Sequence, residues 1–145
     1  MTVNKILLVE DNPDDEELTL IAFKHCLIPN EIIVAHDGVE ALDYMFGSGK
    51  FTGRDTTDFP KMILLDLKLP RIGGLEVLQR LRQDSRIKLV PIIVLTSSNE
   101  VDDIRSSYLL GANSYVRKQV EFESFANTVK ELGVYWLSIN QTVTH

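Results

Sequence analysis

The sequence predicts an α/β protein in which a parallel sheet lies between two layers of helices, the doubly wound three-layer sandwich. Five short apolar runs alternate along the 145 residues with five segments of helical periodicity. Strands that alternate with helices in this way are typical of βαβ units and a parallel sheet. Charged or hydroxyl side chains follow most of the runs, at the carboxyl ends where ligands of such folds bind. We find no repeat and no linker, and we expect one domain over residues 1–145.

The five expected strands are the short apolar runs of the chain. Most are rich in Ile, Leu and Val without polar alternation, as in parallel strands that are covered on both faces. Pro91 stands at the start of the fourth run, where a missing backbone donor is tolerated. The runs are Asn4–Val9, Glu31–Ala35, Met62–Leu65, Pro91–Leu95 and Ser114–Val116.

The segments between these runs have helical patterns. Pro13–Leu27 begins with acidic residues, which the positive end of a helix dipole favours. Gly74–Gln83 places its leucines on one face, as an amphipathic helix does. Gly47–Pro60 is rich in Gly, Ser, Thr and Asp and is expected to be a loop. The other expected helices are Val39–Phe46, Asn99–Leu110 and an extended C-terminal helix over about 121–141.

Composition excludes several classes of protein. The formal net charge of −6 argues against a general nucleic-acid binder, which would present a basic face. No apolar run is long enough to span a membrane. Cys26 is the single cysteine, so an intramolecular disulfide is impossible, and it follows a helical apolar pattern that suits packing. We therefore expect a cytoplasmic protein without nucleic-acid or membrane partners.

The polar residues at the strand ends form a candidate site. Glu10 and Asp11 follow the first strand, Asp66 follows the third, the hydroxyl residues Thr96-Ser97-Ser98 end the fourth, and Lys118 follows the fifth. If strands one and three are neighbours, the three carboxylates share a pocket and repel one another, which protonation or a bound cation relieves. An oxygen-rich site with open positions suits Mg²⁺. Burying Asp66 unpaired would be costly, so the metal and Lys118 are its expected partners.

Each of these residues also has a purely structural interpretation. Asp11 or Asn12 could cap the helix that follows them. Ser97 and Glu100 have the spacing of a capping box, and Lys118 could be a solvated charge. Their coincidence at the ends of four strands that the fold brings together favours a shared site.

These residues together resemble the receiver domain of two-component response regulators. The resemblance covers nearly the whole chain and implies a flavodoxin-like receiver fold with strand order 2-1-3-4-5. The loop FTGRDTTDFP, the ending YWLSI and a receiver without an output domain resemble the small response regulators that partner cyanobacterial phytochromes. The motifs that carry the family resemblance are Glu10-Asp11, Asp66 in LLDLKLP, Gly73-Gly74, Thr96 in VLTSS and Lys118 in YVRK.

The resemblance implies a phosphoacceptor that signals by a conformational switch and has no metabolic turnover. Asp66 would accept a phosphoryl group from a sensor histidine kinase of phytochrome type, and then act on an unknown downstream protein. The implied ligands of Mg²⁺ are Asp11, Asp66, the backbone carbonyl of Lys68 and, through a water, Glu10. Thr96 and Lys118 would contact the phosphoryl oxygens, and Tyr115 occupies the aromatic switch position, although a tyrosine half-buried at a sheet edge is the alternative.

Two departures from the family pattern leave questions open. Gln119 replaces the usual proline after the lysine, and a cis bond without proline costs about 3 kcal/mol, so the loop geometry there is open. Glu10 replaces a second aspartate and lengthens one arm of the acidic pair. A degenerate receiver that binds proteins without phosphate is therefore the alternative function. A Mg²⁺-dependent phosphohydrolase is disfavoured, because Lys68 stands where such enzymes place a second acid.

The end of the chain suggests a surface for self-association. Val134–Leu137 is a continuous apolar block, and a helix needs only one apolar stripe to pack on a sheet. Exposed aromatic clusters tend to be interfaces. We expect a homodimer built on the fourth helix, fifth strand and last helix, with Tyr135 and Trp136 in the interface; the alternative is that the block covers an edge of the core.

Overall fold

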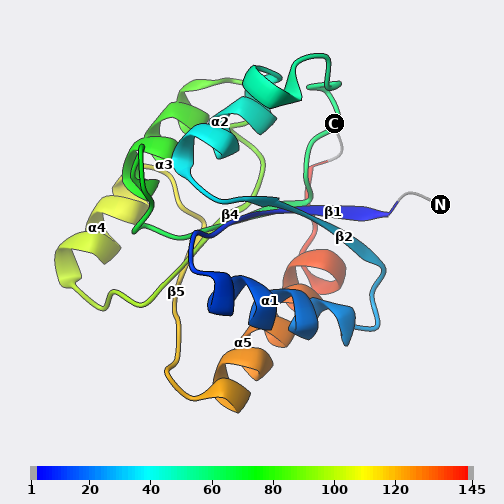
Figure 1. The fold of residues 1–145 in the computed structure, drawn as a ribbon, viewed down its shortest axis with the longest axis vertical. Coiled ribbons are helices and arrows are strands. Elements are labelled where there is room, and N and C mark those ends of the chain that lie inside the picture. Colours follow the sequence, from blue (N-terminus) through cyan, green and yellow to red (C-terminus); the bar gives the residue numbers. More distant parts are fainter. Residues whose placement is uncertain (1–2, 144–145) are drawn as a thin grey trace.

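The computed structural model describes residues 3–143 and shows a five-stranded parallel sheet between two layers of helices (Figure 1). The strand order is β2-β1-β3-β4-β5, which confirms the predicted architecture. The strands are β1 (Asn4–Val9), β2 (Asn30–Ala35), β3 (Met62–Leu65), β4 (Ile92–Thr96) and β5 (Ser114–Arg117).

The register of the sheet aligns the carboxyl ends of the strands. Val9 pairs with Leu65, Leu65 with Val94, and Val94 with Tyr115. Residues that follow these positions in the chain therefore emerge at one edge. This alignment brings the polar ends of β1, β3, β4 and β5 together without any long loop.

The helices cover the sheet on both faces. Figure 1 shows α2 (Gly38–Phe46), α3 (Gly74–Gln83) and α4 (Val101–Leu109) on one face, and α1 (Pro13–Lys24) and α5 (Phe122–Val134) on the other. The strands supply apolar side chains to both layers, as their lack of polar alternation predicts. In β1, Leu7 and Val9 join one buried cluster, while Ile6 and Leu8 join the other.

Most element boundaries follow the sequence pattern closely, and the largest difference is at the end of α1. The Asn12 side chain caps α1 by accepting the backbone N–H groups of Asp14 and Asp15, at 2.9 and 3.1 Å. This helix ends at Lys24 rather than at Leu27, which is fully exposed and so has no packing to extend it.

At the start of α4, the capping-box interpretation of Ser97 is wrong, because Glu100 is the N-cap residue and no side chain caps the helix. The Ser98 hydroxyl contacts this turn: it accepts the N–H of Glu100 at 3.3 Å and donates to Asp103 Oδ2 at 2.5 Å. Ser98 is buried and Ser97 is exposed, so the choice between the two follows from the direction in which the chain leaves β4.

Two arginines hold irregular connections through hydrogen bonds. Arg54 donates to the Tyr44 carbonyl at 2.6 Å and lies over the Tyr44 ring at 4.0 Å, which fixes the expected loop and its short 3₁₀ turn, Gly49–Phe51. Arg82 of α3 is partly buried and donates to five acceptors in the segments before β4 and before β5. Its acceptors are the carbonyls of Ile87, Lys88, Val90 and Gly111 and the side chain of Asn113.

The last helix continues as a π-helical turn. Beyond α5 this turn covers Tyr135–Ile139, so the helical segment ends before the predicted position 141. Trp136 packs against the cluster shared by α1 and α5, whereas Tyr135 and Ile139 are 47% and 61% exposed. The apolar block therefore divides between the core edge and the surface. Within residues 3–143, no helix has the length and apolar character needed to cross a membrane.

Candidate functional site

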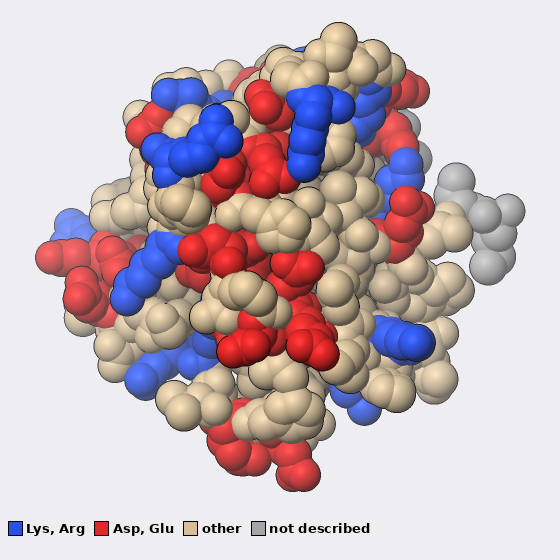
Figure 2. All heavy atoms as spheres, in the orientation of Figure 1, with Lys and Arg blue, Asp and Glu red and all other residues tan. Residues whose placement is uncertain are grey.

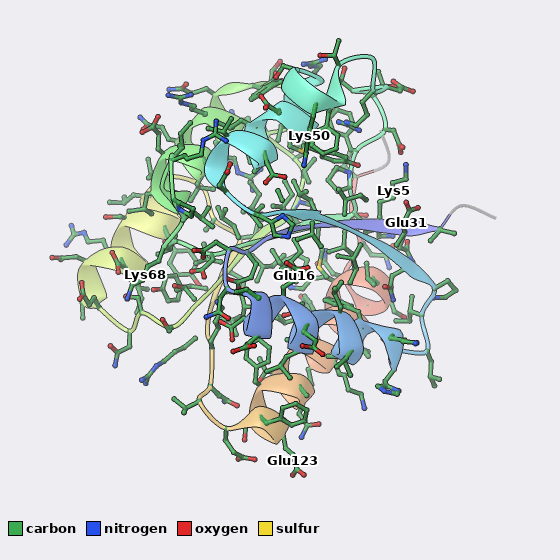
Figure 3. All side chains as sticks on the ribbon, in the orientation of Figure 1. Lys5, Glu16, Glu31, Lys50, Lys68 and Glu123 are labelled. Carbon is green, nitrogen blue, oxygen red and sulfur yellow. The ribbon has the colours of Figure 1, made fainter. Side chains whose placement is uncertain are left out.

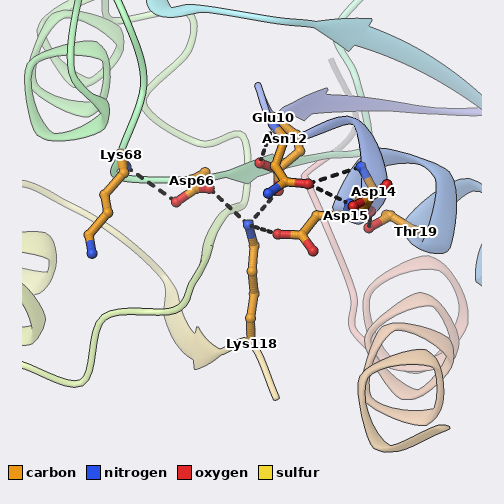
Figure 4. A network of polar contacts seen from close by, with 8 residues as sticks. All are labelled: Glu10, Asn12, Asp14, Asp15, Thr19, Asp66, Lys68 and Lys118. Carbon is orange, nitrogen blue, oxygen red and sulfur yellow. Dashed lines mark hydrogen bonds and ion pairs between the residues drawn. The ribbon is translucent and has the colours of Figure 1, made fainter. Parts of the chain in front are cut away.

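Buried charges from three strand ends converge at the carboxyl edge of the sheet (Figure 4). The Nζ atom of Lys118 lies 2.6 Å from Glu10 Oε1 and 2.8 Å from Asp66 Oδ2. Glu10, Asp66 and Lys118 are 1%, 7% and 8% exposed. The structure thus brings together the residues that the sequence placed at the ends of β1, β3 and β5, and it gives Asp66 the cationic partner that its burial requires.

A third carboxylate, from Asp15 in the first turn of α1, also contacts Lys118. Its Oδ2 lies 2.8 Å from Nζ, and its side chain is 29% exposed. The sequence pattern did not reveal this role, because Asp15 reads as one of several acidic residues at the start of a helix. An ammonium has three N–H donors, and here each has a carboxylate.

Asp11 completes a group of carboxylates that could hold a cation. Oxygen atoms of Glu10, Asp11 and Asp66 lie within 4.8 Å of one another, and Asp11 is exposed to solvent. Such oxygen donors, with one side open to water, suit Mg²⁺ or Mn²⁺.

Lys68 contacts the site through its backbone. Its N–H donates to Asp66 Oδ1 at 3.2 Å, while its exposed side chain extends away from the carboxylates (Figures 3 and 4). The role of its backbone carbonyl as a metal ligand stays a prediction.

Burial and charge shift the pKa values of this network in different directions. Burial raises the pKa of Glu10 to about 7, against the opposing effect of Lys118. Burial also acts to raise the pKa of Asp66, but Lys118 outweighs it and the pKa falls below its usual value. Burial alone would lower the pKa of Lys118, yet Asp15, Asp66 and Glu10 together raise it. Without a metal, the pocket therefore holds an ionised Asp66 paired with a charged lysine.

Thr96 and Tyr115 flank this network. The Thr96 hydroxyl is fully buried and has no hydrogen-bond partner among the described residues, although it lies close enough to lower the pKa of Asp66. A buried polar group without a partner is rare and points to a missing ligand. Tyr115 is partly buried, and its hydroxyl donates to the carbonyl of Ser98 at 2.9 Å. The tyrosine is therefore tied to the loop that follows Thr96.

Gly74 allows the helix after Asp66 to start close to the strand. A Cβ at Gly74 would lie 2.3 Å from the Asp66 carbonyl oxygen and 2.6 Å from Leu67 Cα. At the neighbouring Gly73 the nearest atom would be 4.0 Å away. Only the second glycine of the pair is thus required by close approach.

The chain after Lys118 has no special geometry. The described residues contain no cis peptide bond, and the Lys118 N–H donates to the Thr96 carbonyl at 2.7 Å. Lys118 therefore reaches Asp66 with Gln119 in place of the usual proline, which answers the question that the sequence left open.

The surface around the site is acidic. Figure 2 shows acidic side chains gathered near the middle of the face that carries the start of α1, with lysines and arginines mostly at its margins. Glu16, labelled in Figure 3, belongs to this group and pairs with His36 at 2.8 Å. A cation would therefore approach the carboxylates through a favourable field.

Comparisons with known proteins find relatives that match nearly the whole chain. A model of the response regulator receiver domain matches residues 6–130. The probable methanogenesis regulatory protein FilR2 of Methanothrix harundinacea (strain 6Ac) is 39% identical over 140 residues, which are 94% of this chain and 86% of that protein. Response regulator Rcp1 of Synechocystis sp. (strain ATCC 27184 / PCC 6803 / Kazusa) is 35% identical over 139 residues, 96% of this chain and 90% of that protein.

Solved structures of response regulators also superpose on nearly the whole chain. The phosphorylated cyanobacterial phytochrome response regulator RcpA superposes with a TM-score of 0.92 at 35% identity, covering 99% of this chain and 100% of that one. The Mn²⁺-bound form of Rcp1 gives 0.90 at 33% identity, covering 97% and 99%.

Proposed function

The chain belongs to the receiver domain family of response regulators, and we propose that it is a phosphoacceptor that takes a phosphoryl group on Asp66 from a sensor histidine kinase. One observation carries this proposal: a buried, ionised Asp66 contacts a buried lysine, and the unpartnered hydroxyl of Thr96 lies next to it. A nucleophile, a countercharge and a free donor are what a transferred phosphoryl group needs.

The proposed transfer is a single displacement at phosphorus. A carboxylate oxygen of Asp66 forms a bond to the phosphorus of a phosphohistidine, and the bond from phosphorus to the imidazole nitrogen breaks. The electron pair of that bond stays on the imidazole, which then takes a proton from water. The product is an acyl phosphate on Asp66, and the depressed pKa of this carboxyl keeps it ionised before the transfer.

The residues present fit a divalent cation. Glu10, Asp11 and Asp66 would hold it, and the backbone carbonyl of Lys68 would be a further ligand. When bound, Mg²⁺ neutralises charge on the transferring phosphoryl group. Rcp1 has been crystallised with Mn²⁺, which supports such a site in this family.

Lys118 and Thr96 would receive the phosphoryl oxygens. Lys118 supplies a charge-assisted donor and Thr96 supplies the buried hydroxyl that has no other partner among residues 3–143. If Thr96 moves toward the phosphoryl group, the loop that holds the Tyr115 hydroxyl moves with it. This pair would give the domain two packing states and so carry the signal to the face formed by α4, β5 and α5.

Partners follow from the comparisons and from the surface. The similarity to RcpA supports a kinase of phytochrome type and a signalling role without metabolic turnover. A homodimer is supported by apolar side chains that remain exposed. These are Val101, Tyr108 and Leu109 on α4, Val134 at the end of α5, and Tyr135 and Ile139 in the π-helical turn that follows it.

The structure refines how this dimer should be tested. Trp136 packs against the core, so replacing it would disturb folding, whereas the Tyr135 ring is 47% exposed and stacks edge-on against Trp136 at 5.2 Å. We expect Tyr135→Asp to shift the wild type from dimer to monomer in sedimentation, with Glu123→Gln as an exposed control on α5. A wild type that is monomeric at micromolar concentration would exclude the dimer.

Phosphorylation by acetyl phosphate tests the central proposal. Intact mass should show a gain of one phosphoryl group that needs Mg²⁺, persists in Asp102→Asn and is absent from Asp66→Asn. Asp102 is an exposed aspartate of α4, so its variant controls for the loss of a carboxylate. A wild type that gains no mass with any donor would instead favour a receiver that binds proteins without phosphate.

A further inference from the structure

The loop after Asp66 contains the one residue other than glycine that has a left-handed backbone among residues 3–143. Arg71 has φ +68°, a conformation that costs free energy for a residue with a Cβ. It lies in the loop Lys68–Gly73, which is closed by a hydrogen bond of 2.9 Å from the Gly74 N–H to the Leu67 carbonyl. Residues in such conformations persist where their surroundings hold them, and they cluster at functional sites. The contacts of this loop therefore indicate what holds it in place.

The start of α2 contacts the tip of this loop in two ways. The Arg71 guanidinium donates to Asp37 Oδ2 at 3.3 Å, while Asp37 Oδ1 caps α2 by accepting the Glu40 N–H at 2.8 Å. The two backbones also touch, since a Cβ at Gly38 would lie 2.1 Å from the Ile72 carbonyl oxygen. The position of the helix start therefore determines the position of the loop tip.

Folding alone does not explain an arginine at this position. Glycine or asparagine would adopt φ +68° at lower cost. The pair with Asp37 offsets little of this cost, because the Arg71 and Asp37 side chains are 61% and 13% exposed and exposed pairs contribute little to stability. The place where the arginine holds the loop explains it better than the stability that it adds.

The loop carries Lys68, whose backbone contacts the site. Its N–H donates to Asp66 Oδ1 at 3.2 Å, and its carbonyl is the further metal ligand proposed above. That carbonyl shares a peptide plane with the Leu69 N–H, which makes a long bond of 3.2 Å to the Leu67 carbonyl, only two residues back. Such a bond is weak, so the direction of the Lys68 carbonyl also depends on where the rest of the loop is held.

We propose that Arg71 and Asp37 are positioning residues whose ion pair orients the Lys68 carbonyl toward the proposed metal site. The proposal rests on the metal site of the function inferred above. It makes the start of α2 a support for a site that is built from the ends of β1 and β3. Without the pair, the loop has no single preferred orientation and holds a cation less tightly.

Titration with Mn²⁺, followed by electron paramagnetic resonance of the free ion, tests this on the full chain. Arg71→Gly removes the guanidinium but accepts φ +68° at little cost, so its urea midpoint should stay close to that of the wild type. Its Mn²⁺ affinity should nevertheless fall about threefold, the effect of one largely exposed ion pair. Asp37→Ser keeps an oxygen that can cap α2, and should weaken Mn²⁺ binding by a similar factor.

The signs of these effects separate positioning from a general effect of charge. If only the electrostatic field acted, removing the positive Arg71 would strengthen cation binding and removing the negative Asp37 would weaken it. Positioning predicts that both substitutions weaken it, and that the double variant binds no more weakly than either single variant. Arg86→Ala is the matched control: it removes an arginine that is 52% exposed and pairs with Asp84, and it should not weaken Mn²⁺ binding.

Unchanged or stronger Mn²⁺ binding by Arg71→Gly would overturn the positioning role, and so would additive losses in the double variant. A folded wild type that binds no Mn²⁺ would refute the metal site and the positioning role together. A wild type that binds Mn²⁺ but gains no phosphoryl group from acetyl phosphate would refute the phosphoacceptor function alone. The Mn²⁺ affinities of the variants would then still decide the role of Arg71 and Asp37.

Discussion

Replacing Glu10 by glutamine should stabilise the protein when no metal is bound. Glu10 is 1% exposed, and burial raises its pKa from 4.5 to about 7 although Lys118 lies 2.6 Å away. Ionising this residue is therefore harder in the folded protein than in the unfolded chain. Glutamine keeps one oxygen for Lys118 and carries no charge that must be buried, although its amide NH2 replaces the Oε2 that accepts the Asn12 N–H.

The magnitude follows from the gap between the two pKa values. At about 1.36 kcal/mol per pH unit, a rise from 4.5 to about 7 corresponds to at most about 3 kcal/mol of unfolding free energy. Between these pH values the folded protein keeps a proton that the unfolded chain has released, so the wild type loses stability as pH rises. The Glu10→Gln variant has no carboxyl group at this position, so it does not lose this unfolding free energy as pH rises. The depressed pKa of Asp66 gives a slope of opposite sign at lower pH, which both proteins share.

Urea unfolding in EDTA, followed by circular dichroism, measures the difference. With a slope of about 2 kcal/mol per M, the midpoint of Glu10→Gln should lie up to about 1.5 M above that of the wild type above pH 7, and close to it below pH 4.5. Glu17→Gln, an exposed residue of α1, should show no such divergence. Saturating Mg²⁺ should then favour the wild type, because only it keeps the full set of ligands. A variant that is less stable than the wild type above pH 7 would refute the reasoning.

Three further substitutions test other parts of the structure by urea unfolding. Gly74→Ala should lower the free energy of unfolding by more than about 2 kcal/mol, because its Cβ meets backbone atoms. Gly73→Ala should change it by less than about 0.5 kcal/mol, and equal losses in the two variants would contradict the geometry. Arg82→Lys should lower the free energy of unfolding by about 2 kcal/mol or more, because one ammonium cannot reach acceptors on two segments. An unchanged free energy of unfolding would show that these hydrogen bonds do not stabilise the fold. Tyr115→Phe should lose about 1 kcal/mol with the bond to Ser98 yet keep the phosphoryl gain in intact mass; abolished uptake would place the hydroxyl in the transfer step.

The fold and the centre of the site could be predicted because local pattern determines them. The apolar run that forms β3 is short, continuous and followed at once by Asp66, so strand and acid are specified together. The parallel register then places Asp66 beside Glu10 without further information. The ends of the elements are harder to predict from sequence. Ser97 and Ser98 are adjacent residues with the same side chain, and the sequence pattern does not indicate which of them points toward α4.

Asp15 could not be identified from pattern alone. Its partner Lys118 is 103 residues away, and acidic residues in the first turn of a helix have a sufficient local explanation. The π-helical turn after α5 was missed for a similar reason, because apolar periodicity does not distinguish it from a regular last turn. Both depend on how α1, α5 and the end of β5 pack, which is a property of the assembled domain.

The lysine at the centre of the acidic pocket also bears on how such proteins diverge over evolutionary time. Because Lys118 supplies an internal countercharge to Glu10 and Asp66, the domain can fold before it meets a cation. A descendant could lose Asp11, the exposed carboxylate of the proposed metal site, and still keep a folded scaffold. The Lys118 ammonium, which would serve phosphoryl transfer, would thus also allow the fold to persist after the chemistry is lost.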